Sequence, residues 1–182
     1  DSNVALYEHE NEQYDDYEVD VAFLGDSLTD GYDLQKYYPQ YVTANRGIGG
    51  ETTHGLEKRL KVSVYDLKPK VAVMLIGANN VETMFENYEQ ILRGLQENLP
   101  DTKIVLLSLT AMGGEHWGQK NQLAAYNNVT IKLLAEKYGF TFVGGHPMAG
   151  SHFSGFKHSR SNLFQGASMV LVPPRFDDPM LL

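Results

Sequence analysis

Short apolar runs alternate along this chain with segments of helical periodicity, and this alternation constrains the fold more than any other feature. The runs have the length of strands, and continuous runs of this kind suit strands that are buried on both faces, as in a parallel sheet. They cover residues 19–24, 41–44, 71–76, 104–107 and 140–143. Because helical patterns lie between them, the sequence predicts a doubly wound α/β fold.

The helical patterns are apolar stripes that end at helix-stopping residues. A stripe from Phe85 to Leu99 recurs at i, i+3 and i+7, and Pro100 ends it. Residues 52–65 indicate another helix. A third helix closes at Gly139, where a left-handed cap is favoured. Its stripe consists of Leu123, Tyr126, Leu133, Leu134 and Tyr138.

Composition narrows the classes of function. The 182 residues suffice for one domain with a hydrophobic core. The net charge is −8, so the chain would repel nucleic-acid phosphates and anionic lipid surfaces, and partners of both kinds are disfavoured. Because the chain has no cysteine, disulfides and thiolate chemistry are excluded. No apolar run approaches the roughly 18 residues that a membrane span needs.

Acidic residues dominate the N-terminal segment. We expect residues 1–18 to form a solvated arm, with Leu6 and Tyr7 docking on the domain. Because the chain starts at Asp1 rather than at Met, two alternatives stay open. Either an upstream export signal or anchor has been removed, which implies an exported or surface-attached protein, or the chain was trimmed, which leaves a cytoplasmic location.

Polar residues and glycines follow three of the runs, where ligands bind in a doubly wound sheet. Ser27, in GDSLTDG, sits at an expected helix start, so helix N–H groups can polarise its hydroxyl; the alternative is an N-cap at Asp26 or Ser27. In NRGIGGETT the glycines let the backbone approach a ligand, although the segment also reads as an incomplete dinucleotide loop. Asn79, in IGANN, suits oxyanion stabilisation or a simple turn.

Together the three segments suit acyl transfer. Ser27 would attack a carbonyl carbon. The backbone N–H groups of Ser27 and Gly50 and the amide of Asn79 would surround the oxyanion that forms.

In order and spacing these segments resemble the first three signature blocks of the SGNH (GDSL-type) serine hydrolases, over residues 19–143. The resemblance implies a flavodoxin-like, three-layer α/β/α sandwich with a parallel five-stranded sheet. It also implies that Ser27 is the nucleophile, that Gly50 and Asn79 are oxyanion donors, that the substrate is a small-molecule ester, and that no metal or other cofactor takes part.

The resemblance stops before the family's Asp-x-x-His block, which supplies the general base and the carboxylate that orients it. No Asp of this chain has a His three residues later. Residues 144–182 instead form an atypical tail. Residues 144–174 resemble an internal segment of prephenate dehydrogenase, in which a Gly-His-Pro-Met-x-Gly stretch supplies a substrate-binding histidine that corresponds here to His146. The order of the two resemblances suggests a chimera.

Four histidines are candidates for the general base. His146 follows the fifth run by three residues and ranks first, and His152 ranks second. His158 is a further candidate. His54 forms a local carboxylate–histidine pair with Glu51, or is an exposed residue of a helix. A metal site of His146, His152 and His158 is another alternative, although no carboxylate or Cys partner lies near them.

The sequence therefore predicts a serine ester hydrolase on an SGNH fold, impaired because its Asp-x-x-His block is missing. Without a working base such an enzyme is close to inert. The first alternative is a non-catalytic binding protein on the same fold, and the last is a fragment of a prephenate dehydrogenase.

Overall fold

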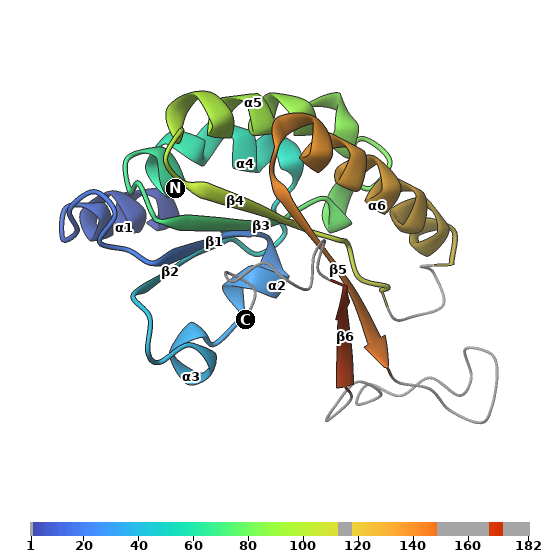
Figure 1. Cartoon of the computed structure of the whole chain (residues 1–182), viewed down its shortest axis with the longest axis horizontal. Coiled ribbons are helices and arrows are strands. Elements are labelled where there is room, and N and C mark those ends of the chain that lie inside the picture. The colour runs from blue at the N-terminus through green and yellow to red at the C-terminus, as the bar shows by residue number, and fades with distance from the viewer. Residues whose placement is uncertain (1, 113–117, 149–167, 173–182) are drawn as a thin grey trace.

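The computed structural model describes residues 2–112, 118–148 and 168–172, and it describes the backbone alone for residues 146–148 and 168–172. The strands in this part of the chain form one sheet in the order β2-β1-β3-β4-β5-β6 (Figure 1). Strands β1 to β5 are parallel, and β6 pairs antiparallel with β5. The predicted doubly wound fold with five parallel strands is confirmed. The strands are β1 (Val21–Gly25), β2 (Thr43–Gly47), β3 (Val71–Leu75), β4 (Lys103–Leu107), β5 (Thr141–Met148) and β6 (Ser168–Val172).

The sheet lies between a layer of long helices and a layer of short ones, as Figure 1 shows. The long layer contains α4 (Thr53–Leu60), α5 (Tyr88–Asn98) and α6 (Gly118–Tyr138), with α4 running on into a π-helical turn, η1 (Lys61–Tyr65). The opposite layer contains α2 (Ser27–Asp30) and α3 (Leu34–Tyr37). Two 3₁₀ turns, η2 (Ala78–Asn80) and η3 (Met84–Glu86), follow β3.

The two faces of the sheet are buried to different degrees. Leu24 and Met74 are fully buried in the core beneath the long helices. Their neighbours Phe23 and Val73 point to the opposite face and are only half-buried. The apolar runs mark β1, β3, β4 and the start of β5, but the run at residues 41–44 only overlaps the start of β2. The short helices α2 and α3 cover their face of the sheet less completely than the sequence suggests.

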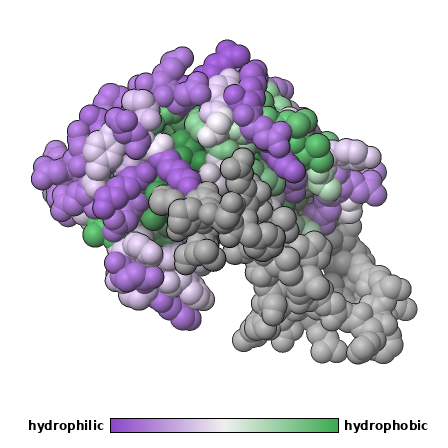
Figure 2. Space-filling model, in the orientation of Figure 1, coloured by the Kyte–Doolittle hydropathy of each residue, from purple (hydrophilic) through white to green (hydrophobic). Residues whose placement is uncertain are grey.

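Helix α5 buries its predicted stripe, whereas α6 follows its predicted stripe only in part, since Leu123, Leu134 and Tyr138 pack against the core. On α5 the residues Tyr88, Ile91, Leu92 and Leu95 are all buried, and the helix ends just before Pro100. On α6 the buried residues are Ala124, Asn127, Ile131 and Ala135. Tyr126 and Leu133 of the predicted stripe are 76% and 59% exposed, and an apolar patch is visible over α6 in Figure 2.

The N-terminal segment differs from the expected solvated arm, because residues 2–11 form a helix, α1 (Ser2–Asn11). Tyr7 docks as expected: it is buried, and its hydroxyl donates to the carbonyl of Gly47 at 2.9 Å. Leu6 does not dock, since half of it is exposed. Asn11 accepts a hydrogen bond from the buried Arg46 at 2.9 Å. Polar contacts rather than an apolar stripe hold α1, so hydrophobic periodicity does not reveal it.

The fifth strand runs further than its apolar run indicates. Strand β5 continues from Thr141 through Met148, past the predicted boundary at residue 144. The reason is β6, which the sequence did not predict and which pairs with the extension from Gly144 to Met148. Among the described residues, no helix combines the length and the apolar character needed to cross a membrane.

Candidate functional site

Three strands end in register at one edge of the sheet. Gly25 of β1 pairs with Gly47 of β2 on one side and with Leu75 of β3 on the other. Neighbouring strands lie about 4.8 Å apart, so the segments that follow these strands start side by side. Because the chain leaves β1 for β2 and then crosses to β3, this edge is a topological switch point, where α/β folds bind ligands.

Ser27 is the first residue of α2 and is exposed. The N-cap of this helix is Asp26, whose Oδ1 accepts the backbone N–H of Leu28 at 2.9 Å. Of the two capping residues that the sequence allowed, the structure therefore assigns Asp26 to the cap. The Ser27 hydroxyl is left on the surface at the sheet edge.

The start of α2 lies directly against the strand ends. At Gly25 and Gly47 any Cβ would overlap atoms of α2, namely the Thr29 side chain and the Asp30 backbone. Asn45 then fastens the helix to β2, since its Nδ2 donates to the carbonyl of Thr29 at 2.7 Å. These contacts fix the place of Ser27 relative to β2.

Asp26 is a buried carboxyl group directly before Ser27, with 1% of the residue exposed. Within the described part of the chain its Oδ2 has no hydrogen-bond partner. Burial raises the pKa of Asp26 above its ordinary value, because the charged form loses its hydration.

The loop after β2 forms a tight turn that requires a glycine. The N–H of Glu51 donates to the carbonyl of Ile48 at 3.2 Å and closes the turn. Gly50 has a φ of +76°, a conformation that side-chain-bearing residues rarely adopt. A Cβ at Gly50 would meet no atom within 4 Å, so this residue faces open space.

The loop after β3 is tied to this turn. The Nδ2 of Asn79, in η2, donates to the carbonyl of Glu51 at 2.8 Å. A primary amide carries two N–H donors, and this contact uses one of them. The structure thus brings Asn79 to the residue next to Gly50, across a sequence separation of 28 positions.

Two further polar residues support these loops, and no sequence pattern singled them out. The buried Asn80 accepts the N–H of Thr53 at 3.2 Å and so fixes the start of α4. Arg59 is buried near the end of α4, where an arginine ordinarily points to solvent. Its Nε binds Glu51 Oε2 at 3.0 Å.

Of the two interpretations of His54, the structure fits the helix residue, since His54 lies in the first turn of α4 and Arg59 binds the Glu51 carboxylate in its place. His54 pairs instead with Glu86 of η3, with 3.2 Å between Nε2 and Oε2, and both side chains are substantially exposed. A carboxylate three residues away is a natural helical neighbour. A buried guanidinium competes for it more strongly here.

The other candidates for the base lie where the structure gives no side chain. The backbone of His146 pairs with Val170 in the β5–β6 hairpin, and its side chain lies outside the described residues. His152 and His158 also lie outside them. Within the described residues no group of three or more His, Cys, Asp or Glu side chains could hold a metal ion.

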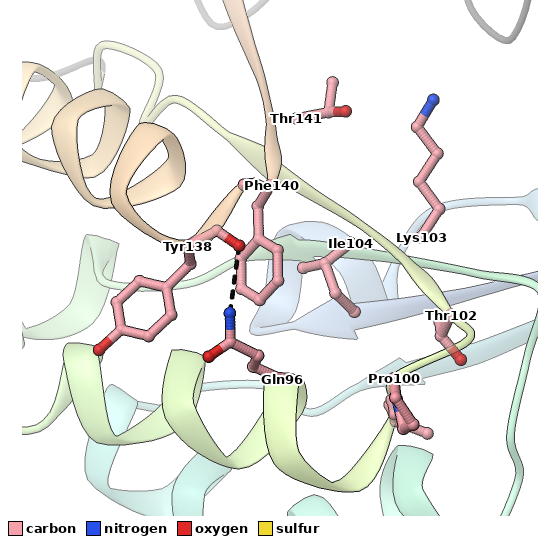
Figure 3. A pocket seen from close by; sticks show the side chains of 10 residues that line it. Gln96, Pro100, Thr102, Lys103, Ile104, Tyr138, Phe140 and Thr141 are labelled. Carbon is pink, nitrogen blue, oxygen red and sulfur yellow. Dashed lines mark hydrogen bonds between the residues drawn. The ribbon is translucent and has the colours of Figure 1, made fainter.

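A pocket of about 280 Å³ lies at the end of the sheet where the strands begin, opposite the carboxyl ends that carry the predicted site (Figure 3). It is lined by the residues that begin β4 and β5, among them Lys103 and Thr141, and by the C-terminal ends of α5 and α6. Gln96 donates to the carbonyl of Tyr138 at 3.3 Å across this pocket. Because ligands of α/β sheets bind at the carboxyl ends of the strands, this pocket is not the predicted site.

Comparison with known proteins gives a family, sequence relatives and solved structures that this chain resembles. Residues 23–161 match the GDSL-like Lipase/Acylhydrolase family, a match that continues past residue 144. Platelet-activating factor acetylhydrolase IB subunit alpha2 from Homo sapiens is 36% identical over 107 residues, which are 54% of this chain and 47% of the relative. The Gallus gallus subunit alpha2 is 34% identical over 148 residues, 71% of this chain and 65% of its own length.

The chain spans about half the length of the first of these relatives. Among solved structures, a GDSL-like lipase from Bacteroides thetaiotaomicron superimposes with a TM-score of 0.66 at 22% identity, over 78% of this chain and 77% of the lipase. That likeness concerns the fold, whereas the family match covers most of the sequence. The chain belongs to the GDSL-like lipase/acylhydrolase family.

Proposed function

We propose that this chain is a serine ester hydrolase that works through an acyl-enzyme. Ser27 Oγ attacks the carbonyl carbon of the ester, and the N–H groups of Ser27 and Gly50 with the Asn79 amide hold the oxyanion. A histidine takes the proton from Ser27 and returns it to the leaving alcohol. Water then hydrolyses the acyl-enzyme by the same path.

One contact carries this proposal, the hydrogen bond from Asn79 Nδ2 to the carbonyl of Glu51. It joins the loop after β3 to the glycine turn after β2, and both loops begin beside the strand end that leads to Ser27. A hydroxyl, a glycine turn exposed to open space and a neutral amide donor thus belong to segments that begin side by side. This supports an arrangement that can stabilise a tetrahedral intermediate.

For the base we propose His146, with His152 as the alternative. Since no Asp-x-x-His block orients either of them, turnover is expected to be lower than in a hydrolase with a complete triad. An oxyanion hole and substrate binding alone retain about 10³-fold acceleration over water.

The substrate proposed is a small-molecule ester with a short acyl group, without a metal or other cofactor. The name of the curated relatives, acetylhydrolase, supports a short acyl chain.

Hydrolysis of p-nitrophenyl acetate, butyrate and octanoate by the unmodified chain and by Ser27→Ala tests the proposal. We expect acetate to be the best substrate and Ser27→Ala to hydrolyse it far more slowly than the unmodified chain, because the nucleophile is gone. Ser2→Ala is the matched control, since Ser2 is also an exposed serine at the first position of a helix, α1. It should keep the activity.

Equal rates for the unmodified chain and Ser27→Ala would contradict the proposal. A chain that hydrolyses none of the three esters above the buffer rate would favour the second candidate, a non-catalytic binding protein on the same fold. The missing Asp-x-x-His block is the observation that keeps this candidate.

A further inference from the structure

Arg59 makes more contacts beneath the proposed site than an ordinary helix residue. It is 6% exposed, and its guanidinium donates to four acceptors. Nε binds Glu51 Oε2 at 3.0 Å, and Nη2 binds the carbonyl of Gly25 at 3.2 Å. Nη1 binds the carbonyl of Arg46 and Ser63 Oγ, both at 2.9 Å. One planar group therefore joins β1, β2, the turn after β2 and η1 to helix α4.

Two of these acceptors belong to the loops of the proposed site. Gly25 ends β1 and stands two residues before Ser27, while Glu51 directly follows Gly50. The rigid fork of a guanidinium fixes the relative position of its acceptors, which a lysine ammonium cannot do. Arg59 thus sets the distance between the strand end that carries the nucleophile and the glycine turn.

Glu51 extends this link to the third loop. Its Oε1 accepts the N–H of Thr52 at 3.1 Å, and its backbone carbonyl accepts the Asn79 amide. The carboxylate lies against Gly55, where a Cβ would overlap Oε1. The path from Arg59 to Asn79 therefore runs through one residue, which is the neighbour of Gly50.

Arg46 provides an internal comparison. It is as deeply buried as Arg59, but its guanidinium binds the carbonyl of Ser63, Asn11 and Glu10, and lies over the Tyr7 ring. These partners belong to η1 and α1 rather than to the loops that carry Ser27, Gly50 and Asn79. Both arginines should stabilise the fold, because removing either one leaves buried acceptors unpaired.

We propose that Arg59, acting through Glu51, is a positioning residue for the glycine turn of residues 48–51, which carries the proposed oxyanion donor Gly50. Its guanidinium holds the Gly50 N–H and the Asn79 amide at a fixed place relative to Ser27. The inference rests on the proposed function for its kinetic consequence, whereas its structural consequence, the order of the turn, stands without it.

The first test compares Arg59→Met with Arg46→Met. Both variants should melt at a lower temperature than the unmodified chain. Only Arg59→Met should lose kcat, by about 10²-fold with KM little changed, because a shift of about 1 Å at a reacting centre has that cost. Equal fractional losses of kcat in the two variants, or an unchanged kcat in Arg59→Met, would overturn the proposal.

The second test moves Glu51 while leaving Arg59 in place. Gly55→Ala favours the helix by its propensity, so this variant should fold, yet the new Cβ displaces the Glu51 carboxylate. It should lower kcat while the chain stays folded at the assay temperature, which circular dichroism checks. Glu51→Gln keeps an acceptor for Arg59 and should retain more activity than Glu51→Ala. If Gly55→Ala keeps full kcat, the positioning role is wrong.

Hydrogen exchange separates this inference from the proposed function. The N–H of Glu51 closes the turn by its bond to Ile48, so its exchange rate reports the order of the turn without any substrate. Exchange at Glu51 should quicken in Arg59→Met and stay slow in Arg46→Met. If it changes equally in both, the inference fails even where the esterase proposal holds. If the chain hydrolyses no ester, the same comparison still decides the inference.

Discussion

The two halves of the sheet's carboxyl edge are built differently. After β1, β2 and β3 the segments are tied together, because Asn79 binds the carbonyl of Glu51 and Arg59 of α4 binds both Glu51 and the end of β1 at Gly25. After β4 the loop binds the helix that follows it, since Asn128 both accepts the N–H of Leu109 and donates to its carbonyl. Strand β5 then leaves the edge in a hairpin with β6.

This difference separates oxyanion stabilisation from proton transfer. The first half carries the proposed nucleophile and oxyanion donors on loops that fix one another. The proposed base, His146, belongs to the second half, in the part of β5 that pairs with β6. Substitution of the nucleophile or an oxyanion donor should therefore change transition-state binding, and substitution of the base should change proton transfer.

The largest effect should come from removing the base. If His146 is the base, His146→Ala lowers kcat by about 10⁴-fold or more, while His152→Ala keeps most of the activity. The reverse pattern assigns the base to His152. The measurement is ester hydrolysis as a function of pH, with circular dichroism to check folding. Full activity in both variants would show that the second half does not supply the base.

The next largest effect is expected at one of two asparagines, each of which binds the backbone of a loop that follows a strand. Asn79→Ala should lower kcat by about 10²- to 10³-fold, because it removes an oxyanion donor. Asn128→Ala should cost about 1–3 kcal/mol of stability, because it leaves the N–H and carbonyl of Leu109 unpaired, with kcat nearly unchanged. Urea unfolding and initial rates measure the two quantities. A larger kcat loss in Asn128→Ala than in Asn79→Ala would contradict the assignment of the oxyanion donors to the first half.

A smaller effect is expected at two glycines with left-handed backbones. Gly50 and Gly139 have φ values of +76° and +70°, and a Cβ at either would meet no atom within 4 Å. Gly50→Ala and Gly139→Ala should each cost roughly 1 kcal/mol of stability from backbone strain alone. Only Gly50→Ala should also lower kcat, since Gly139 lies at the end of α6. Unequal unfolding free energies with equal kcat would contradict this expectation.

The smallest effect is a dependence of stability on pH. Burial raises the pKa of Asp26 above its ordinary 3.8, so the native state keeps a proton that the unfolded state loses. The free energy of unfolding should therefore fall as pH rises from about 3.8 through the raised pKa. Asp26→Asn should remove this contribution and keep the cap, as urea unfolding at several pH values would show.

Asp20 provides a control of opposite sign. The N–H of Val42 and then the ammonium of Lys70 hold the pKa of Asp20 below its ordinary value. Its contribution to stability is present above the ordinary pKa and is lost as pH falls through the lowered one. The same pH trend in Asp20→Asn and Asp26→Asn would contradict both assignments.

Local signals in the sequence predicted the sheet and the loops that follow its first three strands. Apolar runs marked β1 and β3, and glycines marked the turn at Gly50, because strand burial and positive φ each restrict residue type. The α5 stripe and Pro100 gave that helix with nearly correct ends.

Such local patterns do not predict contacts between residues that are far apart in the sequence. Arg59 binds Gly25 from 34 positions away, and α1 is held by Arg46 from 35 and 36 positions away. No periodicity encodes these pairings. On α6 the small Ala124 and Ala135 pack inward and leave Tyr126 outside, because close packing rather than side-chain size decided the face.

A crystal structure of the chain after reaction with an alkyl fluorophosphonate would show whether Ser27 and the two oxyanion donors reach one bound group. We predict a phosphonyl group on Ser27 Oγ, with its oxygen about 2.7–3.1 Å from the Gly50 nitrogen and from Asn79 Nδ2. An adduct on another residue, or a phosphonyl oxygen that neither Gly50 nor Asn79 reaches, would contradict it.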